Sequence, residues 1–292
     1  MIPTDPSASQ AGGRQVRPAT SSDQQKIADL IFFESRVHRH LDWRTPLDWL
    51  GLTPYWVVEE GRHISAALAF PPDPDSIAWI RIFAYTSHLS IEDAWPPLWD
   101  VARQQLAEQG GGTVAAIATQ RWFEQVLLGE NFGLAAHIVL LEWFEGPTEI
   151  LEPPAGIHLR EMTREELSEV VRVDNAAFEP LWCNSRAALS KAFEQSSYAT
   201  VAEEGSHIVG YQLSTGGSFG AHLARLAVLP ELQGRGIGTA LVSDLIAHMH
   251  STGGSKITVN TQAGNTASLA LYGRLGFRRT GERYPVYTLQ VP

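Results

Sequence analysis

A glycine-rich turn between an apolar run and an amphipathic run is the strongest chemical signal in the sequence. The apolar residues 226–228 end shortly before Pro230, and Gly234, Gly236 and Gly238 follow at alternate positions. Glycine lets the backbone turn tightly and lets a ligand approach bare N–H groups, and the N-terminus of the following helix carries about half a positive charge. Such a turn could bind a pyrophosphate, and on the glycine spacing alone it could equally be a turn without a ligand.

Spacing excludes the two common nucleotide-binding turns. A Rossmann turn needs G-x-G-x-x-G and an acidic residue at the end of the next strand, whereas this turn reads G-x-G-x-G and the next predicted strand ends at Asn260. A P-loop needs glycine and lysine followed by serine or threonine, and the sequence contains no such run.

Two motifs in the second half of the chain resemble those of the GNAT superfamily of N-acyltransferases. Residues 233–238, QGRGIG, resemble that family's acyl-CoA signature Q/R-x-x-G-x-G/A. Residues 265–277, NTASLALYGRLGF, resemble its second motif, N-x-x-[AS]-x-x-L-Y-x-x-x-G-F. The two motifs stand in the family's order and separation, which is more specific than either alone. The resemblance covers residues 157–290 through the motifs and 14–145 through the internal repeat described below.

The resemblance implies acetyl-CoA as cosubstrate. The main-chain N–H groups of the turn and of the first helical residues would bind the pyrophosphate, and the preceding strand would line the thioester. The Val228 N–H would donate to the acetyl carbonyl as a one-residue oxyanion hole. Asn265 would bind the CoA arm or cap a helix, and both roles can hold together. The expected acetyl-CoA-binding residues are Leu226, Ala227, Val228, Gln233, Gly234, Arg235, Gly236, Ile237, Gly238, Thr239, Asn265, Ser268 and Tyr272.

The resemblance also implies two catalytic residues. Tyr272 would protonate the departing thiolate, or alternatively pack against the sheet with its hydroxyl at the surface. His222 occupies the strand position where several members carry a base, and an unperturbed pKa near 6.5 suits proton abstraction. An exposed histidine at a strand end is an equal alternative for His222. Glu179, Glu203 and Tyr211 are reserve candidates, acting directly or through water.

The hydrophobic periodicity of the sequence and its turn and capping residues predict the elements that would position these residues. Thr163, with Glu166 three residues later, begins a helix through a capping box. The predicted elements are strand 157–160, helix 163–177, loop 179–184, helix 185–195, strands 198–203, 207–214 and 221–228, helix 236–250, strand 256–260, helix 266–275 and a closing pair of strands. This order predicts a mixed α/β (α+β) domain with a central mixed, mostly antiparallel sheet flanked by helices.

A repeat at an offset of 143–144 residues predicts two tandem copies of this fold. Residues 16–20, 57–64 and 131–134 match 159–163, 201–208 and 274–277. The predicted organisation is a flexible segment 1–14, a degenerate GNAT-like domain 15–146, a linker 147–156 and a catalytic GNAT domain 157–292. The first copy has no glycine turn, and an offset of 143 pairs Tyr272 with Gly129. It holds eight of the nine tryptophans, so it would act as a scaffold or help form the acceptor pocket.

Composition limits the remaining possibilities. The net charge is −10 and no basic run occurs, which disfavours nucleic acid as a partner. Cys183 is the single cysteine, so we expect no disulfide and no cysteine-rich zinc site, and the residue itself is expected to pack or to line a pocket. The histidine pairs 38/40 and 248/250 have poor spacing for a metal on a helix, and no metal is expected. Without a signal peptide or an apolar span, the expected location is the cytoplasm, away from membranes.

Together these patterns predict an N-acetyltransferase that moves the acetyl group of acetyl-CoA to a primary amine by direct attack. The acceptor would be a small-molecule or peptide amine, and the protein would be a monomer, as an intramolecular pseudo-dimer, or a homodimer. Two alternatives remain open. One is an acetyltransferase similar to mycothiol synthase, which is also a tandem member. The other is a non-catalytic module that senses acyl-CoA or another ligand.

Overall fold

The computed structural model describes residues 13–146, 151–217 and 220–292, and these form two compact units. Unit 1 contains the described residues up to Pro72, together with Ala78–Val114 and Gln290–Pro292. Unit 2 contains Asp73–Ile77 and the described residues between Ala115 and Leu289. Most of the predicted segment 1–14, and residues 147–150 of the predicted linker, lie outside the described residues. The predicted domain boundaries stay a prediction.

Unit 1 is built around a five-stranded antiparallel sheet with the strand order β1-β3-β4-β6-β2. Its strands are β1 (Arg14–Pro18), β2 (Arg36–Arg39), β3 (Tyr55–Glu60), β4 (His63–Ala69) and β6 (Ile82–Tyr85), and its helices are α1 (Gln24–Phe33) and α2 (Ile91–Glu108). Ile27 and Leu30 of α1 pack on Val57 and Ala67 of the sheet, with Trp49 in the same cluster. The face of α1 that carries these residues is thereby buried against the sheet.

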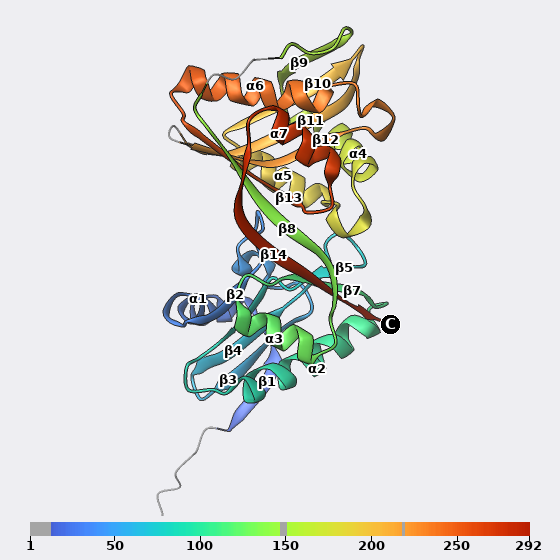
Figure 1. Cartoon of the computed structure of the whole chain (residues 1–292). Helices are drawn as coiled ribbons and strands as arrows, with labels where there is room; N and C mark the ends of the chain where they lie inside the picture. The colour runs from blue at the N-terminus through green and yellow to red at the C-terminus, as the bar shows by residue number, and fades with distance from the viewer. Residues whose placement is uncertain (1–12, 147–150, 218–219) are drawn as a thin grey trace, which may run out of the picture. The chain divides into compact units, whose positions relative to one another are not determined.

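The second sheet has nine strands in the order β5-β7-β14-β8-β13-β12-β11-β10-β9 (Figure 1). Its strands are β5 (Ile77–Trp79), β7 (Gly112–Ile117), β8 (Gly133–Phe144), β9 (Ile157–Glu161), β10 (Tyr198–Glu204), β11 (His207–Gly217), β12 (Gly220–Val228), β13 (Lys256–Gln262) and β14 (Arg278–Val291). The helices of unit 2 are α3 (Arg121–Gly129), α4 (Leu167–Ala177), α5 (Arg186–Gln195), α6 (Ile237–Thr252) and α7 (Thr266–Arg274). The mixed α/β architecture with flanking helices is the predicted fold class.

The strand that completes the sheet of unit 2 comes from before the predicted linker. β8 pairs with β13 on one side, from Lys256↔Phe144 to Gln262↔Ile138, and with β14 on the other. Figure 1 shows β8 and β14 running beside each other as two long strands. The prediction of a closing pair of strands at the C-terminus is therefore wrong. One long strand, β14, closes the chain, and β8 supplies its partner.

Both copies keep the same charged anchor at their first strand. In unit 1, Arg17 binds Asp23 at 2.8 Å and Glu59 at 2.7 Å. In unit 2, Arg160 binds Glu166 and Glu203. Each set combines the strand, the capping box that opens the next helix and the hairpin strand beside it. The repeat in the sequence is thus repeated in three-dimensional contacts.

The ends of the last helices correct one expected correspondence. The Phe277 N–H donates to the Tyr272 carbonyl at 3.0 Å after α7, and the Phe132 N–H donates to the Leu127 carbonyl at 3.0 Å after α3. These are the same C-terminal capping bonds, so Tyr272 corresponds to Leu127 and not to Gly129. The offset grows along the copies, and the first copy has a buried leucine where the second has a tyrosine.

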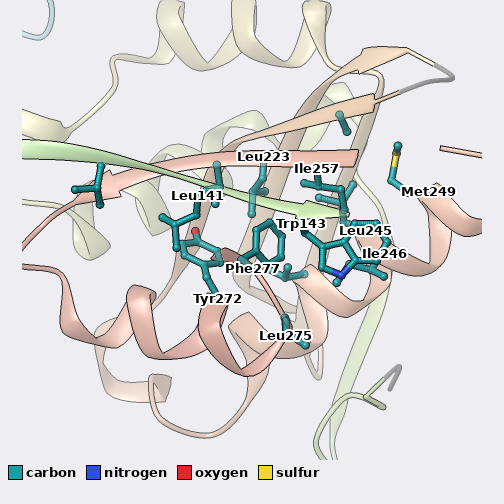
Figure 2. Close-up of a cluster of buried hydrophobic side chains, with 14 residues drawn as sticks. Leu141, Trp143, Leu223, Leu245, Ile246, Met249, Ile257, Tyr272, Leu275 and Phe277 are labelled. Carbon is teal, nitrogen blue, oxygen red and sulfur yellow. The ribbon is translucent and has the colours of Figure 1, made fainter. Parts of the chain in front are cut away.

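The core of unit 2 lies between the sheet and helices α6 and α7. Figure 2 shows its side chains: Leu141 and Trp143 from β8, Leu223 from β12, Ile257 from β13, Leu245, Ile246 and Met249 from α6, Tyr272 and Leu275 from or next to α7, and Phe277. Three strands and two helices meet in this cluster, so it fixes how α7 lies against β12 and β13. Across the part of the chain that the structure describes, no helix combines the length and apolar character needed to cross a membrane.

Candidate functional site

Strands β12 and β13 pair over only part of their length. Their parallel pairing consists of Ala221↔Ile257, His222↔Thr258 and Leu223↔Val259. Beyond Leu223, no described residue pairs with β12 on that side, although β12 continues to Val228. We call the main-chain groups of residues 224–228 on the β13 side the open edge. Such an edge offers unpaired N–H and C=O groups to an extended ligand.

A β-bulge lies where the two strands stop pairing. Opposite Leu213 and Ser214 of β11, strand β12 has Arg225 and Leu223, so Ala224 is an extra residue. A bulge bends its strand and increases the local twist. The bend directly follows the last pair with β13, and it accounts for the divergence that leaves the open edge.

Strand alternation identifies which groups the open edge presents. The Leu229 N–H donates to the Val209 carbonyl of β11 at 2.9 Å. Because successive residues of a strand turn their main-chain groups to opposite sides, the groups of Ala227 also face β11, and those of Leu226 and Val228 face away. The Val228 carbonyl accepts from the Gln233 amide at 3.0 Å. The N–H groups of Leu226 and Val228 therefore lie on the open edge.

The three positions of the predicted turn require glycine for different structural reasons. Gly234 and Gly236 have φ angles of +76° and +93°, a region that favours glycine. Gly238 lies inside α6, where a Cβ would come within 3.0 Å of Leu271 Cδ1 and 3.7 Å of Val228 Cγ2. Its small size lets the first turn of α6 approach both α7 and the end of β12. The glycine spacing therefore brings the helix N-terminus beside the open edge.

The N-terminus of α6 has no internal cap. Its N-cap residue, Gly236, provides no side-chain bond, and the first turn contains no acidic residue. The first helical main-chain bond goes from the Ala240 N–H to the Gly236 carbonyl at 2.9 Å. The N–H groups of Ile237, Gly238 and Thr239 precede it and lie at the positive end of the helix dipole. Arg235, also among the expected binding residues, pairs with Glu204 at 2.9 Å on the surface.

Asn265 and Ser268 lie at the N-terminus of α7. Asn265 is the N-cap, and its Oδ1 accepts from the Ser268 N–H at 3.0 Å. The helix-cap interpretation of Asn265 is therefore confirmed. Its role toward a CoA arm stays a prediction.

Tyr272 lies in the core cluster, and only 4% of its surface is exposed. Its ring is 5.5 Å from that of Phe277, and Figure 2 shows its hydroxyl directed towards Leu141. Leu226 of the open-edge strand packs against the same cluster. Burial raises the pKa of the Tyr272 hydroxyl, so the group keeps its proton at neutral pH and can act as a hydrogen-bond donor.

His222 lies where β12 and β13 still pair. Its Nδ1 is 2.9 Å from Thr258 Oγ1, and the ring is on the face opposite the core residues Ile257 and Val259. Burial lowers the pKa of the imidazole, which keeps it neutral and able to accept a proton. It lies six positions before Val228, which is about 20 Å along an extended strand. His222 thus does not lie beside the Val228 N–H.

The reserve base candidates are already engaged or lie on other elements. The Tyr211 hydroxyl is buried and donates to Asp174, and burial raises its pKa well above the usual range. Glu203 pairs with Arg160. Glu179 precedes a short 3-10 turn, Pro180–Trp182. The thiol of Cys183 donates to the Phe178 carbonyl at 3.3 Å, and burial raises its pKa.

Sequence reasoning missed a buried ion pair beside these residues. Arg225 of β12 binds Asp174 of α4 through both carboxylate oxygens, at 2.7 and 2.8 Å. Asp174 is fully buried and the Arg225 side chain is 13% exposed. Both stand at positions where neighbouring residues are apolar, and two opposite charges at core positions are a detectable signal of pairing. Among the described residues, no cluster of three or more metal-binding side chains occurs.

A family model matches the part of the chain that carries this site. Residues 159–277 match the acetyltransferase (GNAT) family. They include the open edge, the glycine turn, the N-terminus of α6 and the whole of α7.

Curated relatives cover shorter stretches. The N-alpha-acetyltransferase MAK3 of Arabidopsis thaliana is 39% identical over 70 residues, which is 24% of this chain and 37% of that protein. The [Ribosomal protein bS18]-alanine N-acetyltransferase of Escherichia coli is 29% identical over 107 residues, 33% of this chain and 72% of that protein. The chain thus spans less than two fifths of the length of the Arabidopsis relative.

Solved structures share the fold over nearly the whole chain. A tandem GNAT protein from the clavulanic acid biosynthesis pathway has a TM-score of 0.66 at 17% identity, covering 96% of this chain and 99% of that one. A GCN5-related N-acetyltransferase from Sphaerobacter thermophilus has a TM-score of 0.63 at 16% identity, covering 95% and 96%. At such identities the likeness concerns the fold alone.

Proposed function

Residues 159–277 match the acetyltransferase (GNAT) family, and on that premise we propose that the chain is a member that transfers the acetyl group of acetyl-CoA to a primary amine. One observation carries the proposal. The open edge of β12 and the uncapped N-terminus of α6 are adjacent, joined by the glycine turn. Acetyl-CoA joins an extended arm to a diphosphate. The arm matches the open edge, and the diphosphate matches the N-terminus of α6.

The arm of the cosubstrate would bind the open edge as an added strand does. The N–H groups of Leu226 and Val228 supply donors along this edge. The pyrophosphate would accept from the N–H groups of Ile237, Gly238 and Thr239, where the helix dipole favours negative charge. Asn265 caps α7 with its Oδ1, which leaves its amide N–H groups as donors for the arm.

The reaction we propose needs no acyl-enzyme. The amine nitrogen, as a neutral lone pair, attacks the thioester carbonyl carbon and a C–N bond forms. The Val228 N–H donates to the carbonyl oxygen as negative charge develops on it. The C–S bond then breaks, and the products are an amide and the CoA thiolate, which takes up a proton.

Tyr272 is the proposed donor to the thiolate. Its buried hydroxyl has a raised pKa, which is above that of an ordinary thiol near 8.5. Complete proton transfer to the thiolate would therefore be uphill, so we infer that Tyr272 stabilises the developing thiolate by a short hydrogen bond while solvent completes the protonation. The proton from the amine would pass to His222 through water, because His222 lies about 20 Å along the strand from Val228.

The acceptor we propose to test first is a peptide α-amine. The two curated relatives described above are named as an N-alpha-acetyltransferase and as an alanine N-acetyltransferase of a ribosomal protein. The single cysteine and the net charge of −10 support action in a reducing, cytoplasmic compartment and without nucleic acid.

Two measurements on the full chain test the proposal. Calorimetric titration with acetyl-CoA measures binding, and a thiol-release assay with mass spectrometry measures transfer to peptides bearing each N-terminal residue. A matched peptide set with a blocked α-amine and one internal lysine separates the two kinds of amine. We expect binding and peptide-dependent thiol release with acetylated product. Binding without release for any amine would favour the sensing alternative, and failure to bind acetyl-CoA would overturn the proposal.

A further inference from the structure

The segment 178–184 is fastened to β12 by the buried ion pair between Arg225 and Asp174. The Arg225 guanidinium binds Asp174 through both carboxylate oxygens and donates to the Trp182 carbonyl at 2.7 Å. Its Cζ lies 3.6 Å from the centre of the Phe178 ring. One planar side chain therefore holds the segment at two of its residues and α4 at a third.

Asp174 ties the same segment from the other side. Its Oδ2 accepts from the Asn184 N–H at 3.0 Å, and its Oδ1 accepts from the Tyr211 hydroxyl of β11. The carboxylate is fully buried, so each of its bonds replaces a bond to water. The segment is thus held at its beginning, middle and end by a single charged pair.

The position of Arg225 connects this fastening to the proposed reaction. Arg225 directly follows the bulge residue Ala224 and lies three residues before Val228. The segment is consequently placed over the stretch of β12 that forms the open edge, on the α4 face of the sheet. The cosubstrate is expected on the other face, beside α6 and α7. An acceptor approaching the thioester from the α4 face would meet this segment.

We propose that Arg225 is a positioning residue that holds segment 178–184 as the wall of the acceptor site. The stability of its ion pair with Asp174 would then set the apparent affinity for the acceptor. This inference rests on the proposed function. An arginine suits the task because its rigid fork binds a carboxylate, a carbonyl and a ring face together, which a lysine cannot do. A buried pair also fixes one arrangement, because any shifted arrangement leaves a buried charge without its partner.

Cys183 provides a readout that does not depend on catalysis. It is the only cysteine of the chain and lies inside the segment, with its thiol bound to the Phe178 and Glu179 carbonyls. Cys183 is partly exposed, so it reacts slowly in the wild type, and its rate of reaction with an aromatic disulfide reagent should rise when the segment loosens and these two bonds open. In Arg225→Lys we expect this rate to rise about tenfold, because the fork is lost and local opening becomes easier.

A milder variant and a matched control accompany this test. Phe178→Leu removes the ring beneath the guanidinium and leaves both charges, and we expect a rise of about threefold in the thiol reaction rate. Arg160→Lys alters an arginine with two carboxylate partners in the same unit but away from the segment. For this control we expect the wild-type rate. If Arg225→Lys fails to fold by circular dichroism, Phe178→Leu decides the outcome.

The kinetic arm uses whichever peptide the wild-type chain acetylates. We expect Arg225→Lys and Phe178→Leu to raise KM for the peptide about tenfold and threefold, with the Kd for acetyl-CoA unchanged. Unchanged thiol rates in folded variants would overturn the inference, as would raised rates with an unchanged peptide KM. If no amine of any kind is acetylated but the thiol rates rise, the proposed function fails, the fastening role stands and the acceptor-wall role is rejected.

Discussion

The equivalent helices α2 and α6 of the two copies differ at their N-termini. In α2 the Ser90 side chain accepts from the Asp93 N–H at 3.1 Å, and Glu92 and Asp93 place negative charge in the first turn. In α6 the N-cap is Gly236 and the first turn has no acidic residue. The positive end of the helix dipole is neutralised by the chain itself in the first copy. In the second copy, no acidic side chain of the first turn neutralises it.

The sheet edges differ in the same sense. The Thr86 N–H donates to the Ser65 carbonyl at 2.9 Å, as the Leu229 N–H does to that of Val209, so Tyr85 of β6 corresponds to Val228 of β12. β2 pairs with β6 along all four of its residues, from Arg36↔Tyr85 to Arg39↔Ile82. The edge that is open in the second copy is therefore covered in the first. The copies share the arginine clusters, which stabilise the fold, and they differ at the places where the proposed ligand would bind.

Copying the acidic first turn of α2 into α6 should have the largest effect. Thr239 holds the helix position that Asp93 holds in α2, the third after the N-cap. Thr239→Asp should weaken acetyl-CoA binding about 1,000-fold, because like charges at about 4 Å repel by about 4 kcal/mol and each 1.4 kcal/mol is tenfold. Calorimetry measures the Kd. Thr239→Asn has the same shape without the charge, and equal affinities for the two variants would contradict the role of the α6 N-terminus.

Tyr272→Phe tests the chemical difference between the copies, since the first has Leu127 at this place. We expect kcat to fall about 100-fold, at the low end of acid–base contributions, with the Kd for acetyl-CoA unchanged. Initial rates of thiol release at saturating acetyl-CoA and acceptor measure kcat. Tyr287→Phe is the control, because that tyrosine also packs into the protein but its hydroxyl donates to Glu124 of α3. An unchanged kcat in Tyr272→Phe would remove the hydroxyl from the mechanism.

The strand that covers the first copy's edge should be sensitive to acid. Burial lowers the pKa of His38 in β2 to about 4, and its Nε2 lies 3.1 Å from the Ile80 carbonyl. The folded pKa of His38 is below its unfolded value of about 6.5, so the neutral ring contributes to the free energy of unfolding. This stabilisation is complete above pH 6.5 and is lost as the pH falls towards 4. At pH 5 the loss is about 2 kcal/mol.

Urea unfolding at pH 7.5 and pH 5.0, followed by tryptophan fluorescence, measures this loss. His38→Gln keeps an N–H donor but does not titrate, so its stability should fall by about 2 kcal/mol less than that of the wild type. His40 remains in both proteins, and its pKa is lowered mainly by burial and only to a lesser extent by the charge of Arg81 and of His38. Most of its own contribution to the loss therefore cancels in the difference. The same loss in both proteins would show that β2 is not the acid-sensitive strand.

Local patterns predicted much of the second copy and little of how its strands are assembled. The predicted strand 221–228 and the helix beginning near Gly236 correspond to β12 and α6, because turn chemistry and periodicity depend on neighbouring residues. The place of β8 beside β13 could not be predicted, since strands more than a hundred residues apart are matched by packing and not by local sequence.

The candidate site divides in the same way. The glycine turn and the helix cap at Asn265 could be predicted from the sequence, because each depends on contacts within a few residues. The bulge at Ala224 and the pairing of Arg225 with Asp174, 51 residues away, depend on contacts between elements. The repeat predicted the first copy's loss of the turn but not that β2 covers its edge, because no strand among the described residues of the second copy corresponds to β2.

The smallest effect we predict separates a cap that serves only its helix from one that also serves a ligand. Ser90→Ala and Asn265→Ala each remove one N-cap bond, and each should lower the free energy of unfolding by about 1 kcal/mol. Ser90→Ala should leave the Kd for acetyl-CoA unchanged, whereas Asn265→Ala should raise it about fivefold through the loss of an amide donor. Serine is as good a cap as asparagine. Asn265→Ser should therefore recover the stability in thermal unfolding without recovering the affinity, and recovery of both would mean that Asn265 is a cap alone.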